Sequence, residues 1–496
     1  MSTTFVNILL SLSLFDFFFT SSFAYSNRHF LSSTTTISPT QKAEMLITSP
    51  NLFSKDNSSI IKDNPLVHDV PRLVEKKLKF PLLYDDPSIE DLGDYAGYYS
   101  LPHTVGARMF YFFFESRNSE NDPVVIWLSG GPGASCAIAL FYENGPFHIK
   151  DNISLKWNDY GWEKASNIIY VDQPTGTGFS YTTDYQKDIR HNLIGVSNDL
   201  YYFLQEFFMA HPQFVQNDFF ITGQSYAGHY APALASRICQ GNKKGQDIHI
   251  NLKGLAIGNG LTNLKIQYQE LPEYAYKQES LIEESDYIRI KELVPKCESS
   301  IDACVITGRE DPCIAAYVAC DRILNEIIAA AGNINYYDIR KKSVGSLNYD
   351  FSNLENFLNM QSVKEALGVG DISFVLSNTM VFDALIREWA KNFAVGIPKL
   401  LSDGIKVLIY AGDQDLMCNW VGNLRWVSKM KWYGREEFEK VSRVSFVVDG
   451  EEAGLVRNYG PLTFIKVYKA GHLVPMDQPK IALRMIQNWM TGNLIH

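Results

Sequence analysis

A serine, an aspartate and a histidine stand in the chain order and in the local settings that nucleophilic catalysis requires. Ser225 lies in Gly-Gln-Ser-Tyr-Ala-Gly directly after an apolar run, which predicts a sharp strand-to-helix turn that exposes the serine oxygen. Asp413 and Asp415 follow another apolar run, and His472 lies in a Gly-flanked loop near the C-terminus. A lone histidine is more often structural, but three such residues in this order predict a nucleophile, an orienting acid and a general base.

The turn around the serine departs from the simplest nucleophile pattern. Ala227 rather than glycine stands two residues after the serine, although Gly228 follows. Taken alone, the stretch fits a tight turn with a non-catalytic serine as well as it fits a nucleophile turn. An oxyanion hole would need the backbone N–H of Tyr226 and a second N–H from an earlier loop. The Gly-rich loop within 127–135 is the expected supplier.

Short apolar runs that end at Gly-rich loops recur from Asp94 onward. Several carry four to six apolar, often β-branched residues, as in PVVIWL and IKVLIY, which is typical of strands buried on both faces of a parallel sheet. Between them, the spacing of apolar residues over 200–208 predicts an amphipathic helix. Alternating strands and helices predict a doubly wound α/β fold with functional loops at the C-terminal ends of the strands.

Two regions interrupt this pattern. Residues from about 264 to 380 carry clustered cysteines and charged helical segments, and they predict an inserted cap. Residues 25 to about 85 are Ser/Thr/Asn-rich and then basic, without a clear strand or helix pattern, which favours a linker or pro-segment. The predicted organisation is a signal peptide at 1–24, the linker or pro-segment at 25–85, core sequence at 86–263, the cap at 264–380 and core sequence at 381–496.

The N-terminus and the composition indicate where the protein acts. Residues 5–19 form an apolar run of signal-peptide length, and small residues follow it, so we expect a secretory protein that is extracellular or vacuolar. No later run reaches the roughly 18 apolar residues of a membrane span, so we expect no membrane anchor. The net charge of −10 and the lack of a Lys/Arg cluster exclude a nucleic-acid partner. Asn57 and Asn152 begin Asn-X-Ser sequons and are candidate glycosylation sites.

Four cysteines, Cys297, Cys304, Cys313 and Cys320, lie at intervals of 7, 9 and 7 residues. This symmetric spacing suits two nested disulfides, although four cysteines allow three pairings and spacing does not choose among them. A zinc site is the alternative, but there is no Cys-X-X-Cys and no nearby histidine to support it. We therefore expect disulfides here, and neither a metal nor another cofactor.

Several blocks of the sequence together resemble the serine carboxypeptidase family, including its plant members. They are GGPGAS, FYENGPF, YVDQPTGTGFSY, GQSYAGHYAP, LAIGNG, GDQDLMCNW and GHLVPMDQP, spread between about Asp94 and Asn493. The resemblance implies an α/β-hydrolase fold with a mostly parallel central sheet and an inserted helical cap. It also implies a peptide substrate, from which C-terminal amino acids are released through an acyl-enzyme at acid pH.

The resemblance also implies a role for each candidate catalytic residue. Ser225 would be the nucleophile, His472 the general base and acid, and Asp415 the residue that orients the histidine. Gly131 and Tyr226 would supply the backbone N–H groups of the oxyanion hole.

Ser129, Glu143 and Gln224 stand where the resemblance implies that the substrate's terminal carboxylate is bound. Family members have Asn, Glu and Glu at these positions, so only Glu143 is retained. Two neighbouring carboxyls share a proton and can donate it to the substrate, whereas Gln224 is neutral and donates at every pH. Without a second carboxyl to raise its pKa, Glu143 would be ionised near neutrality. We therefore expect recognition of the terminal carboxylate to be weakened but not abolished.

The cysteine pattern matches the family only in part. The implied pairs that this chain retains are Cys297–Cys320 and Cys304–Cys313, and Cys418 falls where a free thiol near the leaving-group pocket is common. Two further implied pairs are missing, because Ala134 and Ser377 occupy one and Ser343 and Asn348 occupy the other. We expect the Gly-rich loop to be less rigid without the first bridge. Cys136 is an extra thiol without a partner that the sequence reveals.

Two other functions compete with a serine-type carboxypeptidase. One is acyl transfer from an activated ester to an alcohol, which the same triad can serve. The other is a hydrolase-fold binding protein with little catalysis. The presence of all three triad residues, both oxyanion positions and Glu143 favours the peptidase. The preferred C-terminal residue and the oligomeric state are left open.

Overall fold

A mixed sheet of 11 strands forms the framework of the computed structural model, which describes residues 72–78, 80, 94–345 and 347–494. The predicted signal peptide at 1–24, Asn57 and most of the segment 25–85 lie outside the described residues. In spatial order the strands are β1 (Leu73–Lys77), β2 (Asp94–Ser100), β3 (Arg108–Phe114), β7 (Asn167–Asp172), β4 (Val124–Leu128), β8 (Phe219–Ser225), β9 (Leu252–Gly260), β10 (Lys406–Gly412), β13 (Leu462–Val467), β12 (Glu451–Tyr459) and β11 (Val444–Val448). A separate pair consists of β5 (Phe147–Ile149) and β6 (Leu155–Trp157).

The centre of the sheet is parallel. β7, β4, β8, β9, β10 and β13 run in one direction, and antiparallel strands extend both edges. β4, with the sequence VVIWL, is buried at every position because both of its faces are covered. The apolar runs that the sequence predicted as strands form β4, β7, β8, β9 and β10. The predicted α/β fold with a parallel centre is therefore confirmed.

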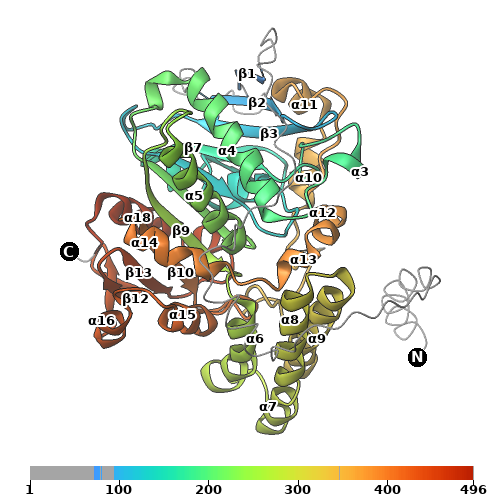
Figure 1. Cartoon of the computed structure of the whole chain (residues 1–496), viewed down its shortest axis with the longest axis vertical. Coiled ribbons are helices and arrows are strands. Elements are labelled where there is room, and N and C mark those ends of the chain that lie inside the picture. The colour runs from blue at the N-terminus through green and yellow to red at the C-terminus, as the bar shows by residue number, and fades with distance from the viewer. Residues whose placement is uncertain (1–71, 79, 81–93, 346, 495–496) are drawn as a thin grey trace, which may run out of the picture. The chain divides into compact units, whose positions relative to one another are not determined.

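Helices cover both faces of this sheet and create two hydrophobic cores (Figure 1). Helices that contribute to the first core include α4 (Leu193–Ala210), α5 (Ala227–Lys244), α14 (Ile397–Ser402), α15 (Trp420–Lys429) and α16 (Arg435–Lys440). Helices of the second core are α10 (Ser352–Leu358), α11 (Gln361–Leu367), α17 (Val474–Asp477) and α18 (Pro479–Thr491). Successive strand residues point to opposite cores, so Ile126 packs in the first and Trp127 in the second. α4 confirms the amphipathic helix predicted over 200–208.

Between β9 and β10 the chain is helical, and this stretch contains the predicted cap. α6 to α9 gather at the bottom of the view in Figure 1, below the sheet. α8 and α9 form a hairpin that two disulfides link, Cys297–Cys320 and Cys304–Cys313, the pairing that the resemblance implied. The expected cap boundary at 380 falls inside α12. The helices of this stretch that precede α14, apart from α10 and α11, are α6 (Leu264–Glu273), α7 (Glu284–Lys291), α8 (Val294–Thr307), α9 (Glu310–Ala331), α12 (Thr379–Ala384) and α13 (Ile386–Trp389).

The segment expected to be a linker or pro-segment contributes a strand to the sheet. β1 pairs with β2 at the edge, with Leu73 opposite Tyr99 and Lys77 opposite Tyr95. Its sequence, LVEKK, is half-buried or exposed throughout. β1 is held by backbone pairing and by polar contacts such as that of Glu75 with His211, 2.9 Å apart. Its sequence has no apolar face that would have revealed it.

None of the helices in the described part of the chain is both long and apolar enough to cross a bilayer. α9, with 22 residues, carries charged side chains along its length.

Candidate active site

Ser225 stands at a sharp turn between β8 and α5, as the sequence predicted. Its φ is +60°, in the left-handed region that a non-glycine residue adopts at a cost, and such residues cluster at functional sites. A Cβ at Gly223 would lie 2.4 Å from a backbone oxygen of β4, and a Cβ at Gly228 would lie 2.3 Å from another backbone oxygen. Glycine is therefore required at 223 and 228. The structure accommodates Ala227 between them, which explains the departure from the simplest pattern.

Asp415 and His472 form a buried hydrogen-bonded pair at the same edge of the sheet as Ser225. Asp415 follows β10 and His472 follows β13, and both strands run parallel to β8 and β9, so their C-terminal ends lie at one edge. The Nδ1–H of His472 donates to Asp415 Oδ2 over 2.7 Å, and both side chains are buried. With Nδ1 engaged in this way, Nε2 is the nitrogen that can act as a base.

Asn259 is a site residue that the sequence analysis missed. At the end of β9, its Nδ2–H donates to Asp415 Oδ2 over 2.7 Å, and its Oδ1 accepts the backbone N–H of Gly412 over 3.2 Å. The backbone N–H of Cys418 donates to Asp415 Oδ1 over 3.1 Å. These contacts distinguish Asp415 from Asp413, whose backbone oxygen accepts a hydrogen bond from a tyrosine hydroxyl. The available signal was a polar residue at the end of a buried strand, in the block LAIGNG.

The loop of His472 is held by the segment that follows α9. The backbone N–H of His472 donates to Tyr337 O over 2.7 Å, and the Tyr337 ring lies 4.5 Å from the imidazole. Asp477 accepts the backbone N–H of Gly471 over 2.7 Å and pairs with Lys341 over 2.9 Å. Tyr337 and Lys341, which lie inside the predicted cap region, therefore hold the loop of the candidate base.

The Gly-rich loop lies directly against the serine turn. A Cβ at Gly130 would lie 2.6 Å from Tyr226 N and 2.6 Å from Ser225 Cβ. The next residue, Gly131, has a φ of +106°, which favours glycine. The Tyr226 side chain is fully buried and stacks on His229, with ring centroids 4.4 Å apart. The loop of Gly131 and the turn of Tyr226 are thus in contact, as an oxyanion hole requires.

Glu143 and Gln224 are paired in the interior. Gln224 Nε2–H donates to Glu143 Oε1 over 2.6 Å, and Glu143 Oε2 has no hydrogen-bond partner among the residues that the structure describes. Burial raises the pKa of Glu143 to about 8, and the Gln224 hydrogen bond opposes this shift only in part. The expectation that Glu143 is ionised near neutrality is therefore wrong, because removal from water replaces a second carboxyl as the cause of the raised pKa.

Ser129 lies one residue before the Gly-rich turn and is buried. Its Oγ accepts a hydrogen bond from the Trp127 indole N–H over 3.3 Å, so its own proton can be directed elsewhere. Glu143 ends a π-helical turn, Ala139–Glu143, a local irregularity that is frequent at functional sites.

The two segments are held together at both places where an implied disulfide is missing. Ala134 and Ser377 form an isolated antiparallel bridge, with their backbones side by side. Ser343 Oγ–H donates to Asn348 Oδ1 over 2.6 Å. The segments that a disulfide would have joined are therefore still adjacent.

Two free thiols, Cys136 and Cys418, are buried beside carboxylates. Cys136 Sγ–H donates to Asp172 Oδ1 over 3.2 Å, a partner that the sequence did not reveal. Within the described part of the chain, the group with metal-ligand spacing is Asp415, Cys418 and His472, whose ligand atoms lie within 4.8 Å of one another. Asp415 and His472 are already hydrogen-bonded to each other, so we interpret this group as part of the candidate site around Ser225.

Comparisons with known proteins identify relatives of this chain. A model of the serine carboxypeptidase family matches residues 85–492. Serine carboxypeptidase-like 48 of Arabidopsis thaliana is 54% identical over 99% of this chain and 97% of its own length. Serine carboxypeptidase 3 of Hordeum vulgare is 54% identical over 92% of this chain and 90% of its own length. A prohormone-processing carboxypeptidase from Saccharomyces cerevisiae has a similar crystal structure, with a TM-score of 0.75 and 26% identity over 84% of this chain and 95% of that one. The chain belongs to the serine carboxypeptidase family.

Proposed function

We propose that this protein is a serine-type carboxypeptidase that releases C-terminal amino acids from peptides through an acyl-enzyme. The observation that carries the proposal is the placement of Ser225, at a left-handed φ, on the sheet edge that holds the hydrogen-bonded Asp415–His472 pair. Membership of the serine carboxypeptidase family supports the same reaction.

In the acylation step, Ser225 Oγ attacks the last peptide carbonyl and passes its proton to His472 Nε2. The negative oxygen accepts hydrogen bonds from the backbone N–H groups of Gly131 and Tyr226. His472 then gives the proton to the leaving amine, and Asp415 orients and stabilises the imidazolium. Water repeats the sequence on the acyl-enzyme and restores the serine.

Recognition of the terminal carboxylate rests on neutral donors in this proposal. Glu143 is protonated below about pH 8 because burial raises its pKa, so it can donate a hydrogen bond rather than repel an anion. Gln224 is neutral at every pH and adjoins it, at 2.6 Å. Ser129 supplies a hydroxyl one residue before the Gly-rich turn. Binding is therefore strongest in acid, where Glu143 keeps its proton.

The proposed location is the secretory pathway, either outside the cell or in the vacuole. Two disulfides support it because they persist in oxidising compartments. Asn152 is exposed in the turn between β5 and β6, where a glycan could be attached. Treatment with an N-glycosidase should increase the electrophoretic mobility of protein expressed in plant cells. Asn152→Gln should reduce that change in mobility, and equal mobility with and without the glycosidase would refute glycosylation.

The first experiment measures release of the C-terminal amino acid from an N-blocked dipeptide between pH 4 and pH 8. We expect release by the purified wild-type protein and none by Ser225→Ala. An organophosphonate probe that labels the serine supplies a second readout. No release from protein that the probe still labels would favour acyl transfer to another acceptor, and loss of both signals would favour a binding protein.

A further inference from the structure

Residues 376–378 bind the outer side of the Gly-rich loop. Ser135 N–H donates to Leu376 O and Asn378 N–H donates to Gly133 O, each over 3.0 Å. These two hydrogen bonds flank the antiparallel bridge described above. The segment therefore acts as a short partner strand for the Gly-rich loop.

The side chain of Asn378 extends these contacts to two more segments. Its Nδ2–H donates to Gly176 O over 2.8 Å, and its Oδ1 accepts the backbone N–H of Met380 over 3.0 Å at the start of α12. Its own carbonyl oxygen is so close to Gly133 that a Cβ there would lie 2.6 Å away. One residue thus joins the Gly-rich loop, the loop that follows β7 and the first turn of α12.

Asp172 holds the inner side of the same loop. This fully buried carboxylate accepts Ser135 Oγ–H over 2.6 Å and the backbone N–H of Cys136 over 3.0 Å. Its second oxygen accepts the backbone N–H of Phe179 over 2.9 Å. The Gly-rich loop therefore lies between two anchors, Asp172 on the inside and Asn378 on the outside.

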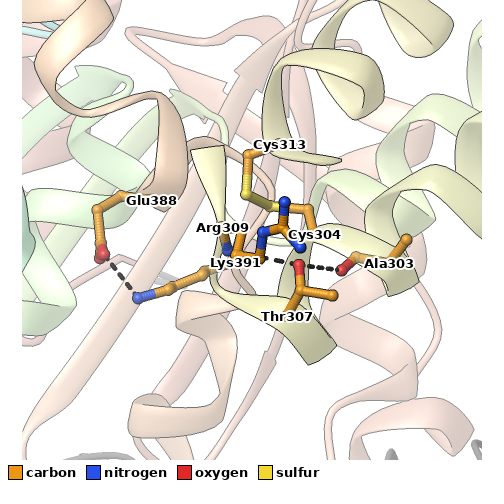
Figure 2. The surroundings of a disulfide bond; sticks show 7 residues. All are labelled: Ala303, Cys304, Thr307, Arg309, Cys313, Glu388 and Lys391. Carbon is orange, nitrogen blue, oxygen red and sulfur yellow. Dashed lines mark hydrogen bonds and ion pairs between the residues drawn. A yellow bond between two sulfur atoms is a disulfide. The ribbon is translucent and has the colours of Figure 1, made fainter. Parts of the chain in front are cut away.

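The outer anchor is itself braced by the cap. Arg387 of α13 pairs with Glu310 of α9 over 2.8 Å, and the Tyr317 and Trp389 rings lie 5.2 Å apart. Figure 2 shows the Cys304–Cys313 disulfide of the hairpin together with the ion pair between Glu388 and Lys391, whose atoms are 2.6 Å apart. The Phe382 ring of α12 also lies 5.4 Å from the Tyr317 ring. α12 and α13 are therefore both in contact with α9, and Asn378 lies at the start of this braced unit.

We propose that Asn378 is a positioning residue for the oxyanion hole, through which the cap fixes the Gly-rich loop against the nucleophile. The inference rests on the proposed function. Gly131 and Gly133 both have positive φ values, so the loop backbone is intrinsically deformable. Stabilising a tetrahedral intermediate requires donors placed to within about 0.5 Å. Asn378 supplies this precision without touching the substrate.

The first test compares Asn378→Ala with Asn242→Ala in the dipeptide assay. Asn242 is a matched control because its side chain also makes a two-sided contact, to Ile250 O over 2.8 Å and to Ile250 N–H over 3.0 Å, just before β9 begins and at the edge of the sheet opposite the Gly-rich loop. We expect Asn378→Ala to lower kcat by about 10- to 100-fold with little change in KM, because a misplaced oxyanion donor weakens transition-state binding. The Asn242 variant should keep the wild-type kcat. Equal kcat in both variants would overturn the proposal.

The second test separates positioning from a general loss of folding. Ala134 and Ser377 are the non-hydrogen-bonded pair of the bridge, a geometry with Cα atoms about 4.5 Å apart that a disulfide can span. Ala134→Cys with Ser377→Cys, added to Asn378→Ala, should restore most of the lost kcat when oxidised and lose it again on reduction. The reductant also acts on the native disulfides. Wild-type protein and Asn378→Ala, both treated with the same reductant, are the controls for that effect. If the triple variant forms the disulfide and its kcat stays as low as that of Asn378→Ala, the proposed positioning role is contradicted.

The two proposals can fail independently. An organophosphonate places its negative oxygen in the same hole, so the rate of Ser225 labelling reports the position of the loop without any peptidase activity. If wild-type protein releases no amino acid but is labelled faster than Asn378→Ala, the carboxypeptidase function is wrong and the positioning role stands. If the wild type releases the amino acid, and Asn378→Ala matches it in both labelling rate and kcat, only the positioning role is wrong.

Discussion

The side-chain amide of Gln224 lies 2.6 Å from Glu143 Oε1, in a place where water cannot stabilise a negative charge. A buried carboxyl paired with an amide can keep its proton, just as a carboxyl paired with a second carboxyl can. Burial raises the pKa of Glu143 to about 8. Loss of the second carboxyl has therefore not removed the proton that the proposed recognition of the substrate carboxylate requires.

The first prediction concerns the alkaline limb of activity. kcat/KM should fall as the pH rises past about 8, because Glu143 then ionises and repels the substrate carboxylate. Glu143→Gln cannot ionise, so this limb should move to higher pH. Measuring kcat/KM from pH 4 to pH 9 with an N-blocked dipeptide checks both statements.

The control is the same dipeptide with its C-terminal carboxyl converted to an amide. This substrate has no charge for Glu143 to repel, so wild type and Glu143→Gln should show the same profile with it. A limb near pH 8 that persists in Glu143→Gln would show that another group controls binding.

The second prediction tests the residue beside Glu143. Gln224→Glu places two carboxyls within hydrogen-bond distance, and such a pair shares one proton and titrates with two apparent pKa values. We expect kcat/KM near pH 4 to change little, because both carboxyls are then protonated donors. The decline with pH should begin earlier and be broader than in the wild type. A profile identical to that of the wild type would exclude Gln224 from the carboxylate site.

The triad residues were predictable because each follows a strand. Ser225 ends β8, and Asp415 and His472 lie a few residues past the ends of β10 and β13; parallel strands bring such residues to one edge. Asn259 and Asn378 were not predictable as site residues. Their roles depend on contacts with residues that are more than 100 positions away in the sequence, and no local pattern reveals such contacts.

Two other features escaped prediction for physical reasons. The pKa of Glu143 depends on how completely the fold excludes water from it, which the identities of its neighbours in sequence do not reveal. β1 escaped because an edge strand held by backbone pairing needs no apolar face. The cap was predicted as a region, from its cysteines and charged helices, but its contacts with the Gly-rich loop and the His472 loop were not.

The third prediction concerns Asn259. Its hydrogen bond to Asp415 joins a neutral donor to a buried carboxylate, a type of bond worth about 1.5–3 kcal/mol. Asn259→Ala should therefore lower kcat by roughly 10- to 100-fold with a smaller effect on KM, because Asp415 would no longer be held for His472. Single-turnover release from the dipeptide measures this directly.

Asn423→Ala is the matched control for that variant. Asn423 is also fully buried, but its amide donates to Cys418 O over 2.8 Å and its oxygen accepts from the Trp426 indole. We expect a lower melting temperature with kcat close to that of the wild type. If both variants lose kcat in proportion to their stability, Asn259 has only a structural role.

The fourth prediction concerns stability rather than rate. Oxidised Ala134→Cys with Ser377→Cys should raise the free energy of unfolding by about 2–4 kcal/mol, because the link closes a long loop in the unfolded chain. Ser343→Cys with Asn348→Cys closes a much shorter loop and should stabilise less. Thermal unfolding with and without reductant, relative to wild type under the same conditions, gives both values. A larger gain from the short loop would contradict the chain-entropy explanation.

The last prediction follows from two buried carboxyls that share one cation. Burial raises the pKa of both Asp94 and Glu163 to about 7, although Arg117 opposes the shift and lies 3.4 Å from Glu163. A carboxyl whose pKa is higher in the folded than in the unfolded protein stabilises the fold fully in acid, below the pKa of the unfolded chain. This contribution is lost as the pH rises toward 7.

The free energy of unfolding should therefore decrease between about pH 4 and pH 7, and Glu163→Gln should make the decrease smaller by roughly 3 kcal/mol, the value of a shift from 4.5 to about 7. Glu437→Gln, at a side chain that is 51% exposed, should leave the slope unchanged. Urea unfolding at each pH measures the slopes. Parallel curves for wild type and Glu163→Gln would mean that Glu163 is already ionised in the folded protein, and that its ion pair with Arg117 outweighs its loss of hydration.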